Sequence, residues 1–219
     1  MTTTPPPTPP LGDPYAPLRR ALAIAEPVQN LLLARPRGEL TRLLRERGCR
    51  RVLDVCCGAG ALAQRLTAAG LEVVGVDASP TMLERARRKG GFAVHRLDAA
   101  ALPFAHEFDA AVVVLALHEM DGAARSAVWE GMRRAVRPGG LLAALDFAPP
   151  GPGLVSRVAG RWIESDERSF RRIHSPHHDN FRAFVAEGGL PAWVRARGGR
   201  IVAARRFWGG NLALIAVEG

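Results

Sequence analysis

Residues 52–60 read VLDVCCGAG and residues 73–77 read VVGVD, and these two stretches decide the fold. Each opens with the short apolar run of a buried strand, and the first leads through Gly58 and Gly60 into a helical segment. Glycines at this turn let a ligand approach the backbone at a helix N-terminus. Asp77 ends the second strand, where a carboxylate can accept both hydroxyls of a ribose. The pair therefore predicts a nucleotide-containing ligand.

Outward from this pair, apolar stretches alternate with amphipathic ones along most of the chain. Near-continuous apolar strands between such helices indicate a parallel sheet covered on both faces. The last two expected strands are joined by glycines, which predicts a hairpin that makes the final strand antiparallel. We expect an α/β, doubly wound, mostly parallel seven-stranded sheet. Its strands are expected at residues 52–56, 72–77, 92–97, 108–117, 141–147, 201–208 and 211–218.

The 219 residues fit one domain, which we expect to span residues 17–219. Residues 1–16 are rich in Thr and Pro and are expected to form a disordered tail. Residues 17–48 show helical apolar spacing and predict a cap of helices over the site. Residues 150–185 are expected to form a lid over the acceptor, with residues 150–176 irregular.

Charge and apolar content exclude several classes of protein. The net charge is +9, and all but one of the 30 basic residues are Arg, Lys89 being the exception. These residues are spread along the chain rather than gathered in a stripe with stacking aromatic residues, which argues against nucleic-acid binding. The sequence contains no stretch of eighteen consecutive apolar residues, so no membrane span is expected.

The cysteines indicate the compartment and argue against a metal centre. Cys49, Cys56 and Cys57 form an odd, clustered set, which is no disulfide framework and suggests a reducing compartment, the cytoplasm. Adjacent cysteines also lack the spacing of a zinc site, so no metal is expected from them.

Two cofactors compete for the glycine turn. Gly58-Ala-Gly60-Ala-Leu-Ala63 fits the dinucleotide pattern G-x-G-x-x-A, with Asp77 nineteen residues after the first glycine. Three features favour S-adenosylmethionine. Asp54 lies inside the first strand, where it would repel a pyrophosphate but suits the ammonium of a methionine moiety. Asp98 follows the third strand, where it could accept a hydrogen bond from adenine. The terminal hairpin is the third feature.

Five motifs, in order and register from Arg51 to Phe147, resemble those of class I S-adenosylmethionine-dependent methyltransferases. The resemblance is greatest to the branch that includes ubiquinone/menaquinone C-methyltransferases and related small-molecule enzymes. The motifs are VLDVCCGAG (52–60), VVGVDASPTML (73–83), LDAAALPF (97–104), FDAAVVVLALHEM (108–120) and RAVRPGGLLAALDF (134–147).

The resemblance implies S-adenosylmethionine as cofactor and a set of residues that bind it. Those expected at the methionine and ribose are Asp54, Gly58, Ala59, Gly60 and Asp77. Those expected at the adenine and sulfonium are Ala78, Met82, Asp98, Ala99 and Leu115.

Methyl transfer mainly requires alignment of donor and acceptor, and a base only when the acceptor atom carries a proton. His118 follows the fourth strand and is the candidate base, with Glu119 to orient it. Alternatively, His118 only shapes the pocket or caps the next helix. His178 is a further candidate, from a cluster with His174 and His177. The last two histidines of this cluster point to different sides of a helix, so no metal site is expected there.

The resemblance implies a methyltransferase acting on a small-molecule acceptor by in-line displacement. No Asn-Pro-Pro-Tyr-type motif is present, which argues against methylation of an exocyclic base nitrogen. Two alternatives stay open. One is a methyltransferase acting on RNA or protein, and the other is a protein that binds S-adenosylmethionine without transferring its methyl group.

Overall fold

The protein is built around one seven-stranded sheet with the strand order β3-β2-β1-β4-β5-β7-β6. The computed structural model describes residue 13 and residues 15–170 and 175–219. Strands β1 to β5 pair in parallel, and β7 runs antiparallel to both β5 and β6. This confirms the predicted fold class. The strands are β1 Arg51–Val55, β2 Glu72–Asp77, β3 Ala93–Arg96, β4 Phe108–Val114, β5 Val136–Phe147, β6 Ile201–Phe207 and β7 Leu212–Glu218.

The direction of the chain across the sheet reverses between β1 and β4. From β1 it proceeds through β2 to β3 at one edge, then returns to β4 on the other side of β1. Ligands of such sheets bind outside the carboxyl ends of the strands at this reversal. The α-helices are α1 Arg19–Leu32, α2 Ala34–Glu46, α3 Ala61–Ala68, α4 Pro80–Lys89, α5 Gly122–Ala135, α6 Leu154–Phe170, α7 Ser175–Ala186 and α8 Gly189–Arg195. Single 3-10 turns are η1 Ala16–Leu18, η2 Ala99–Ala101, η3 Leu117–Glu119 and η4 Trp208–Gly210.

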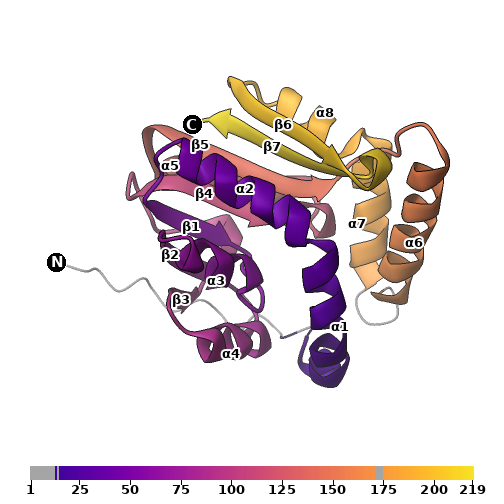
Figure 1. Cartoon of the computed structure of the whole chain (residues 1–219), viewed down its shortest axis with the longest axis horizontal. Coiled ribbons are helices and arrows are strands. Elements are labelled where there is room, and N and C mark those ends of the chain that lie inside the picture. Colours follow the sequence, from indigo (N-terminus) through magenta and orange to yellow (C-terminus); the bar gives the residue numbers. More distant parts are fainter. Residues whose placement is uncertain (1–12, 14, 171–174) are drawn as a thin grey trace.

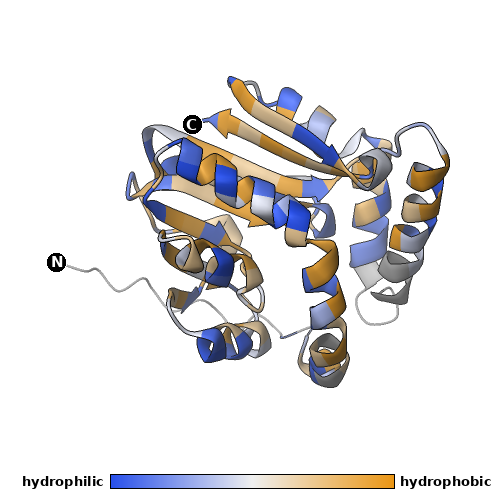
Figure 2. Ribbon diagram, viewed as in Figure 1, coloured by the Kyte–Doolittle hydropathy of each residue, from blue (hydrophilic) through white to orange (hydrophobic). Residues whose placement is uncertain are grey.

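Each face of the sheet carries its own hydrophobic core. On one face, Trp129 of α5 packs edge-on against Trp193 of α8, with ring centroids 5.2 Å apart. On the other face, Leu40 of α2 and Leu62 of α3 are buried. Figure 2 shows mostly hydrophobic strands and a hydrophilic outer side on α2. Burial on both faces explains why the strands are apolar runs rather than alternating patterns.

Three helices gather where β4 and β5 end. Figure 1 shows α1, α6 and α7 at the end of the sheet toward which these strands point. The prediction that residues 150–176 are irregular was wrong, because Leu154–Phe170 form the single helix α6. Helical spacing turns Ser156 and Ile163 inward, seven residues apart, while Leu154 stays 69% exposed. Leu154, Val155, Val158, Trp162 and Ile163 recur at helical spacing, so the sequence did carry a signal for this helix that the prediction overlooked.

The N-terminal cap consists of η1, α1 and α2, which lie within the predicted residues 17–48 apart from Ala16. Most of the predicted tail lies outside the described residues, but Asp13 and Tyr15 make contacts. Asp13 Oδ1 accepts a hydrogen bond from Ser79 Oγ at 2.7 Å, and its Oδ2 accepts one from the Thr81 amide at 3.0 Å. The first described residue therefore lies against the first turn of α4. No helix in the described part of the chain is long and apolar enough to cross a membrane.

Candidate active site

The glycine turn joins β1 to α3 and forms the first part of the site. Gly58 and Gly60 have φ angles of 53° and 75°, and Cys56 shares this left-handed region with φ 56°. A Cβ built on Gly60 would lie 2.6 Å from the ring of Phe92, whereas one on Gly58 would meet nothing within 4 Å. Gly60 is thus required by packing, while Gly58 leaves space beside the backbone that a ligand can use.

Asp77 ties the end of β2 to this turn. Its Oδ2 accepts a hydrogen bond from the Gly58 amide at 2.8 Å, and its Oδ1 accepts one from the Ser79 amide at 2.9 Å. Burial raises the pKa of Asp77, although these hydrogen bonds oppose the shift. Ala59 also contributes its carbonyl, which accepts a hydrogen bond from Lys89 Nζ at 2.6 Å. The carboxylate therefore lies beside the turn, as the ribose position requires.

The residues expected at the adenine lie at the ends of the neighbouring strands. Ser79 caps α4 by accepting a hydrogen bond from the Met82 amide at 3.1 Å, and Ala78 immediately precedes this cap. Asp98 caps η2 through the Ala100 amide at 2.9 Å, with Ala99 as the first residue of that turn. The carboxylate of Asp98 thus has a structural role as an N-cap.

Asp54 is buried in the middle of β1, with 2% of its surface exposed. Among the described residues, its Oδ2 has no hydrogen-bond partner. Burial, assisted by the charge of Asp77, raises the pKa of Asp54 to about 7, and the charge of Arg37 opposes this shift. The ionised form of a buried carboxyl group is costly unless a cation or hydrogen-bond donors meet it. Asp54 is therefore suited to bind an ammonium group.

Arg37 of α2 is a further candidate for the site that sequence reasoning missed. Burial lowers the pKa of its guanidinium, while Asp54 raises it. Its Nη1 donates to Asn30 Oδ1 at 2.8 Å, but its Nε is buried without a hydrogen-bond partner in the described structure. The signal was available, because Arg37 lies on the same helical stripe as buried Leu40 and Leu44. Arg37 and Asp54 together offer opposite charges, which match the two ends of an amino acid.

The second part of the site follows β4. Leu115 directly after the strand has φ 51°, a left-handed conformation that is rare for a branched side chain, and its amide donates to the Leu145 carbonyl at 2.8 Å. Such backbone conformations cluster at functional sites. The chain then turns through η3, which presents His118 and Glu119 at the carboxyl end of the sheet.

Asp146 of β5 orients His118. Its Oδ1 lies 2.7 Å from His118 Nδ1, and both side chains are at most 3% exposed. Asp146 also accepts hydrogen bonds from the amides of Leu117 at 2.9 Å and Phe147 at 2.7 Å. Because every contact to this carboxylate is a donor, Nδ1 of His118 carries a proton toward it. Asp146 is thus an orienting partner of His118 that the sequence analysis did not name. An acid within an apolar strand was the available signal, as it was for Asp54.

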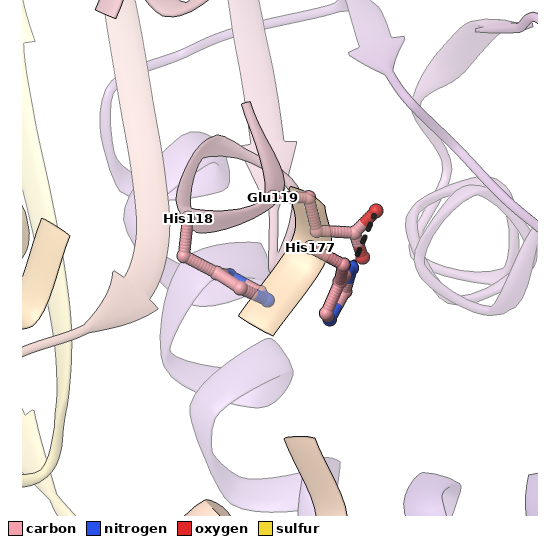
Figure 3. Close-up of side chains that lie close together, drawn as sticks. All are labelled: His118, Glu119 and His177. Carbon is pink, nitrogen blue, oxygen red and sulfur yellow. Dashed lines mark ion pairs between the residues drawn. The ribbon is translucent and has the colours of Figure 1, made fainter. Parts of the chain in front are cut away.

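Glu119 belongs to a group that includes His177 of α7. Its Oε2 accepts a hydrogen bond from Tyr15 Oη at 3.2 Å and lies 3.7 Å from His177 Nδ1. Asn180 Nδ2 donates to the Glu119 carbonyl at 2.8 Å, which fastens η3 to α7. Ligand-type atoms of His118, Glu119 and His177 all lie within 4.8 Å of one another. Figure 3 shows these three side chains close together. We name these three residues the HEH cluster.

His178 lies apart from the HEH cluster. It is 4% exposed, and its ring packs against Phe181 with centroids 6.4 Å apart. Neither ring nitrogen has a hydrogen-bond partner among the described residues. His177, on the neighbouring face of α7, occupies the position beside His118, with ring centroids 5.7 Å apart. His174 lies outside the described residues.

Tyr15 connects the two parts of the site. The charge of Glu119, then burial and the charge of Asp77, raise its pKa well above the usual value. Tyr15 therefore hydrogen-bonds to the HEH cluster through Glu119 and is close enough to Asp77 for that charge to affect it. Burial raises the pKa of Cys56 and Cys57, so both thiols stay protonated. The site therefore offers carboxylates and imidazoles, and no thiolate from these two cysteines.

Comparison with known proteins identifies the family of the chain. Residues 52–140 match a family described as a methyltransferase domain. The chain is 40% identical over 172 residues to a demethylmenaquinone methyltransferase of Thermus thermophilus, covering 70% of this chain and 76% of that protein. It is 30% identical over 171 residues to the ubiquinone/menaquinone biosynthesis C-methyltransferase UbiE of Pseudomonas paraeruginosa, covering 64% of each. A match to an uncharacterised methyltransferase of Synechocystis, 40% identical, covers 46% of this chain and only 48% of that protein.

Solved structures share the fold at lower identity. The N-methyltransferase NodS from Bradyrhizobium japonicum, solved with S-adenosyl-L-homocysteine, is 19% identical with a TM-score of 0.66, covering 95% of this chain and 99% of that one. An O-methyltransferase family protein from Burkholderia thailandensis is 17% identical with a TM-score of 0.59, covering 93% and 62%. These structures show the fold, and the sequence matches show that the chain belongs to the class I S-adenosylmethionine-dependent methyltransferases, enzymes whose cofactor is S-adenosylmethionine.

Proposed function

We propose that this chain transfers the methyl group of S-adenosylmethionine to a small-molecule acceptor bound beside His118. The observation that carries the proposal is the buried His118–Asp146 pair, 2.7 Å apart, at the carboxyl end of β4. The names of the quinone C-methyltransferases among its relatives support a small acceptor. The free cysteines support a reducing compartment, the cytoplasm.

Different residues in the first part of the site bind the different parts of the cofactor. In this proposal Asp54 binds the methionine ammonium, Arg37 its carboxylate and Asp77 the ribose. The adenine lies between Ala78 and Met82 on one side and Asp98 and Ala99 on the other. Leu115 lies below the sulfonium. Two fixed charges for a zwitterion explain why Arg37 and Asp54 are kept buried together.

The reaction is an in-line displacement at the methyl carbon. The acceptor atom forms a bond to that carbon, the carbon–sulfur bond breaks, and its electron pair returns to sulfur to give S-adenosylhomocysteine. His118 assists the departure of the acceptor's proton, because Asp146 fixes the tautomer that presents Nε2 as a lone-pair site. Orientation of the two reactants supplies most of the acceleration, about 7–11 kcal/mol.

The acceptor is enclosed by α6, α7 and the N-terminal segment in this proposal. Phe147 and Phe181 lie against His118, with ring centroids 4.7 and 6.0 Å away, and provide an apolar wall. Residues 150–185 act as the lid, and α1 with Tyr15 covers the opposite side.

Methyl-labelled cofactor incubated with metabolite, RNA and protein fractions tests the proposal. We expect label in the small-molecule fraction and production of S-adenosylhomocysteine. Asp146→Asn should lower turnover at least tenfold with cofactor affinity unchanged, because the imidazole loses its fixed tautomer. His95→Ala on the exposed strand β3 is the control and should match the native rate. Label in RNA or protein, or cofactor binding without turnover in any fraction, would contradict the proposal.

A further inference from the structure

The HEH cluster combines two imidazoles and one carboxylate from two separate segments of the chain. His118 and Glu119 lie on η3, and His177 lies on α7. Their ligand-type atoms lie within 4.8 Å of one another. We propose that the HEH cluster binds a divalent transition-metal ion of the zinc, cobalt or iron(II) class. This reverses the expectation from sequence spacing, since the three ligands do not form a local motif.

The identity of the ligands selects the class of ion. Two histidines and one glutamate form a ligand set used by catalytic zinc, and two histidines with one carboxylate also bind iron(II). Magnesium and calcium prefer sites made of oxygen ligands, so a cluster with two imidazoles does not suit them. Three protein ligands also leave at least one coordination position for an outside group.

Asp146 supplies the outer partner that metal-binding histidines have. Histidines that bind metals usually donate their other ring N–H to a carboxylate, which fixes the ring and raises its basicity. The 2.7 Å contact between His118 Nδ1 and Asp146 Oδ1 is this arrangement, in a place where both side chains are buried. Nε2 of His118 is therefore the nitrogen that can serve as a ligand.

The distances need only small adjustments to accept an ion. Tetrahedral zinc with bonds of about 2.0–2.1 Å places its ligand atoms about 3.3 Å apart. His177 Nδ1 and Glu119 Oε2 are 3.7 Å apart. Rotation of the Glu119 side chain can close the wider gaps, because its main chain is already fixed by Asn180. The backbone of the cluster is thus in place before the ion binds.

Such an ion would also define the class of acceptor, a consequence that rests on the proposed function. Its open position faces the acceptor side of the site, where it could hold an acceptor oxygen, such as a hydroxyl or enol group. The ion would lower the pKa of that oxygen's proton, and His118 would act as a ligand rather than as the proton acceptor. Acceptors with an ionisable oxygen are therefore the expected substrate class.

Metal binding to the complete, tag-free chain tests the inference without any acceptor. After treatment with a chelator, cobalt(II) and zinc(II) are titrated by calorimetry, and the cobalt complex by absorption. We expect one ion per chain, a dissociation constant of about 10⁻⁵ M or tighter, and a cobalt spectrum without sulfur ligation. His118→Ala and His177→Ala should each weaken binding at least tenfold, and Asp146→Asn should weaken it about 10–100-fold. Magnesium should produce no saturable signal.

The controls separate a lost site from a lost fold. His95→Ala removes an exposed histidine and should bind the ion as the native chain does. Binding of S-adenosylhomocysteine should persist in every variant, because none removes a proposed cofactor contact. Absence of saturable binding below about 10⁻⁴ M, or binding that survives both His118→Ala and His177→Ala, would overturn the inference.

The same measurements distinguish failure of this inference from failure of the proposed function. Methyl transfer that continues at the full rate with chelator present, in a chain that binds no ion, overturns the metal site and leaves His118 as the proton acceptor. An ion bound by the HEH cluster, without methyl transfer to any small molecule, overturns the proposed function and supports the metal site.

Discussion

At the scale of single residues, the unusual groups are the carboxyl groups that are buried inside the protein. Asp54 is a carboxyl group in the middle of an apolar strand, and Asp146 is another in β5. Asp146 is surrounded by donors, whereas Asp54 faces Arg37 without a hydrogen bond to its Oδ2 in the described structure. The fold itself supplies the hydrogen bonds of Asp146. Asp54 retains an oxygen that can bind a ligand.

Cofactor binding should depend on pH through Asp54. Burial raises its pKa to about 7, so the unliganded protein holds a proton there below that pH. The cofactor ammonium favours the carboxylate, so affinity should rise as pH increases toward about 7 and level off above it. Calorimetry in buffers of different ionisation enthalpy should detect proton release on binding at about pH 6. Asp54→Asn should flatten this dependence, and proton release that persists in the variant would assign it to another group.

Cofactor binding and chemistry should separate at Asp77 and His118. Asp77→Ala removes the proposed ribose contacts and the acceptor for the Gly58 amide. Hydrogen bonds to charged groups contribute about 1.5–3 kcal/mol, so affinity for S-adenosylhomocysteine should fall at least tenfold. His118→Ala touches no proposed cofactor contact and should stay within about threefold by calorimetry, since that is below 1 kcal/mol. A comparable loss for both variants would place His118 in the cofactor site.

At the scale of elements, the three residues of the turn from β1 to α3 serve both the packing of the fold and the proposed ligand binding. Gly60 begins α3 as its N-cap in the left-handed region and lies against Phe92, which precedes β3. Gly58 is also in the left-handed region, but the space beside it is open. One glycine therefore serves the fold and the other serves the site.

Alanine substitutions should tell these two glycines apart. Gly60→Ala places a Cβ 2.6 Å from the Phe92 ring. An alanine in the left-handed region costs roughly 1–2 kcal/mol by itself. Because of the added clash, Gly60→Ala should lower the free energy of unfolding by more than that amount. Gly58→Ala meets no atom within 4 Å and should lose only about that amount, yet weaken S-adenosylhomocysteine binding. Denaturant unfolding and calorimetry measure the two effects. Equal stability losses, or unchanged affinity in Gly58→Ala, would contradict this division.

At the scale of the whole molecule, the basic residues behind the net charge of +9 are spread along the sequence rather than concentrated in one segment. Many arginines are paired with acids on the same chain, as Arg137 is with Asp109 at 2.7 Å and Arg19 with Glu84 at 2.6 Å. Others bind carbonyl oxygens, as Arg125 does at Leu117 and Met120. Paired cations release few counterions from a nucleic acid, so they add little affinity for it.

Affinity for random RNA should therefore be weak. We expect a dissociation constant above about 10⁻⁶ M at physiological salt, with a steep decrease in affinity as salt rises. Fluorescence anisotropy with a labelled single-stranded oligonucleotide measures both. Submicromolar binding that is insensitive to salt would instead support a nucleic-acid substrate.

The sequence by itself determined the sheet, its one antiparallel strand, the cofactor family and the position of the glycine turn. These features depend on local patterns, since buried parallel strands, helix caps at Ser79 and Asp121 and a glycine turn each leave a signal within a few residues. Helix α6 has the same kind of local signal in Leu154, Val155, Val158 and Trp162, and only the structure shows that these apolar side chains remain exposed.

Only the tertiary structure decided which side chains meet at the acceptor side. Asp146 is 28 residues from His118, and Tyr15 is 104 residues from Glu119. Pairing of β5 beside β4 brings the first pair together, and docking of α7 on η3 brings His177 to the HEH cluster. The choice of His177 rather than His178 depends on the rotation of α7 against the sheet. Such long-range contacts follow from the packing of whole elements, which no local pattern encodes.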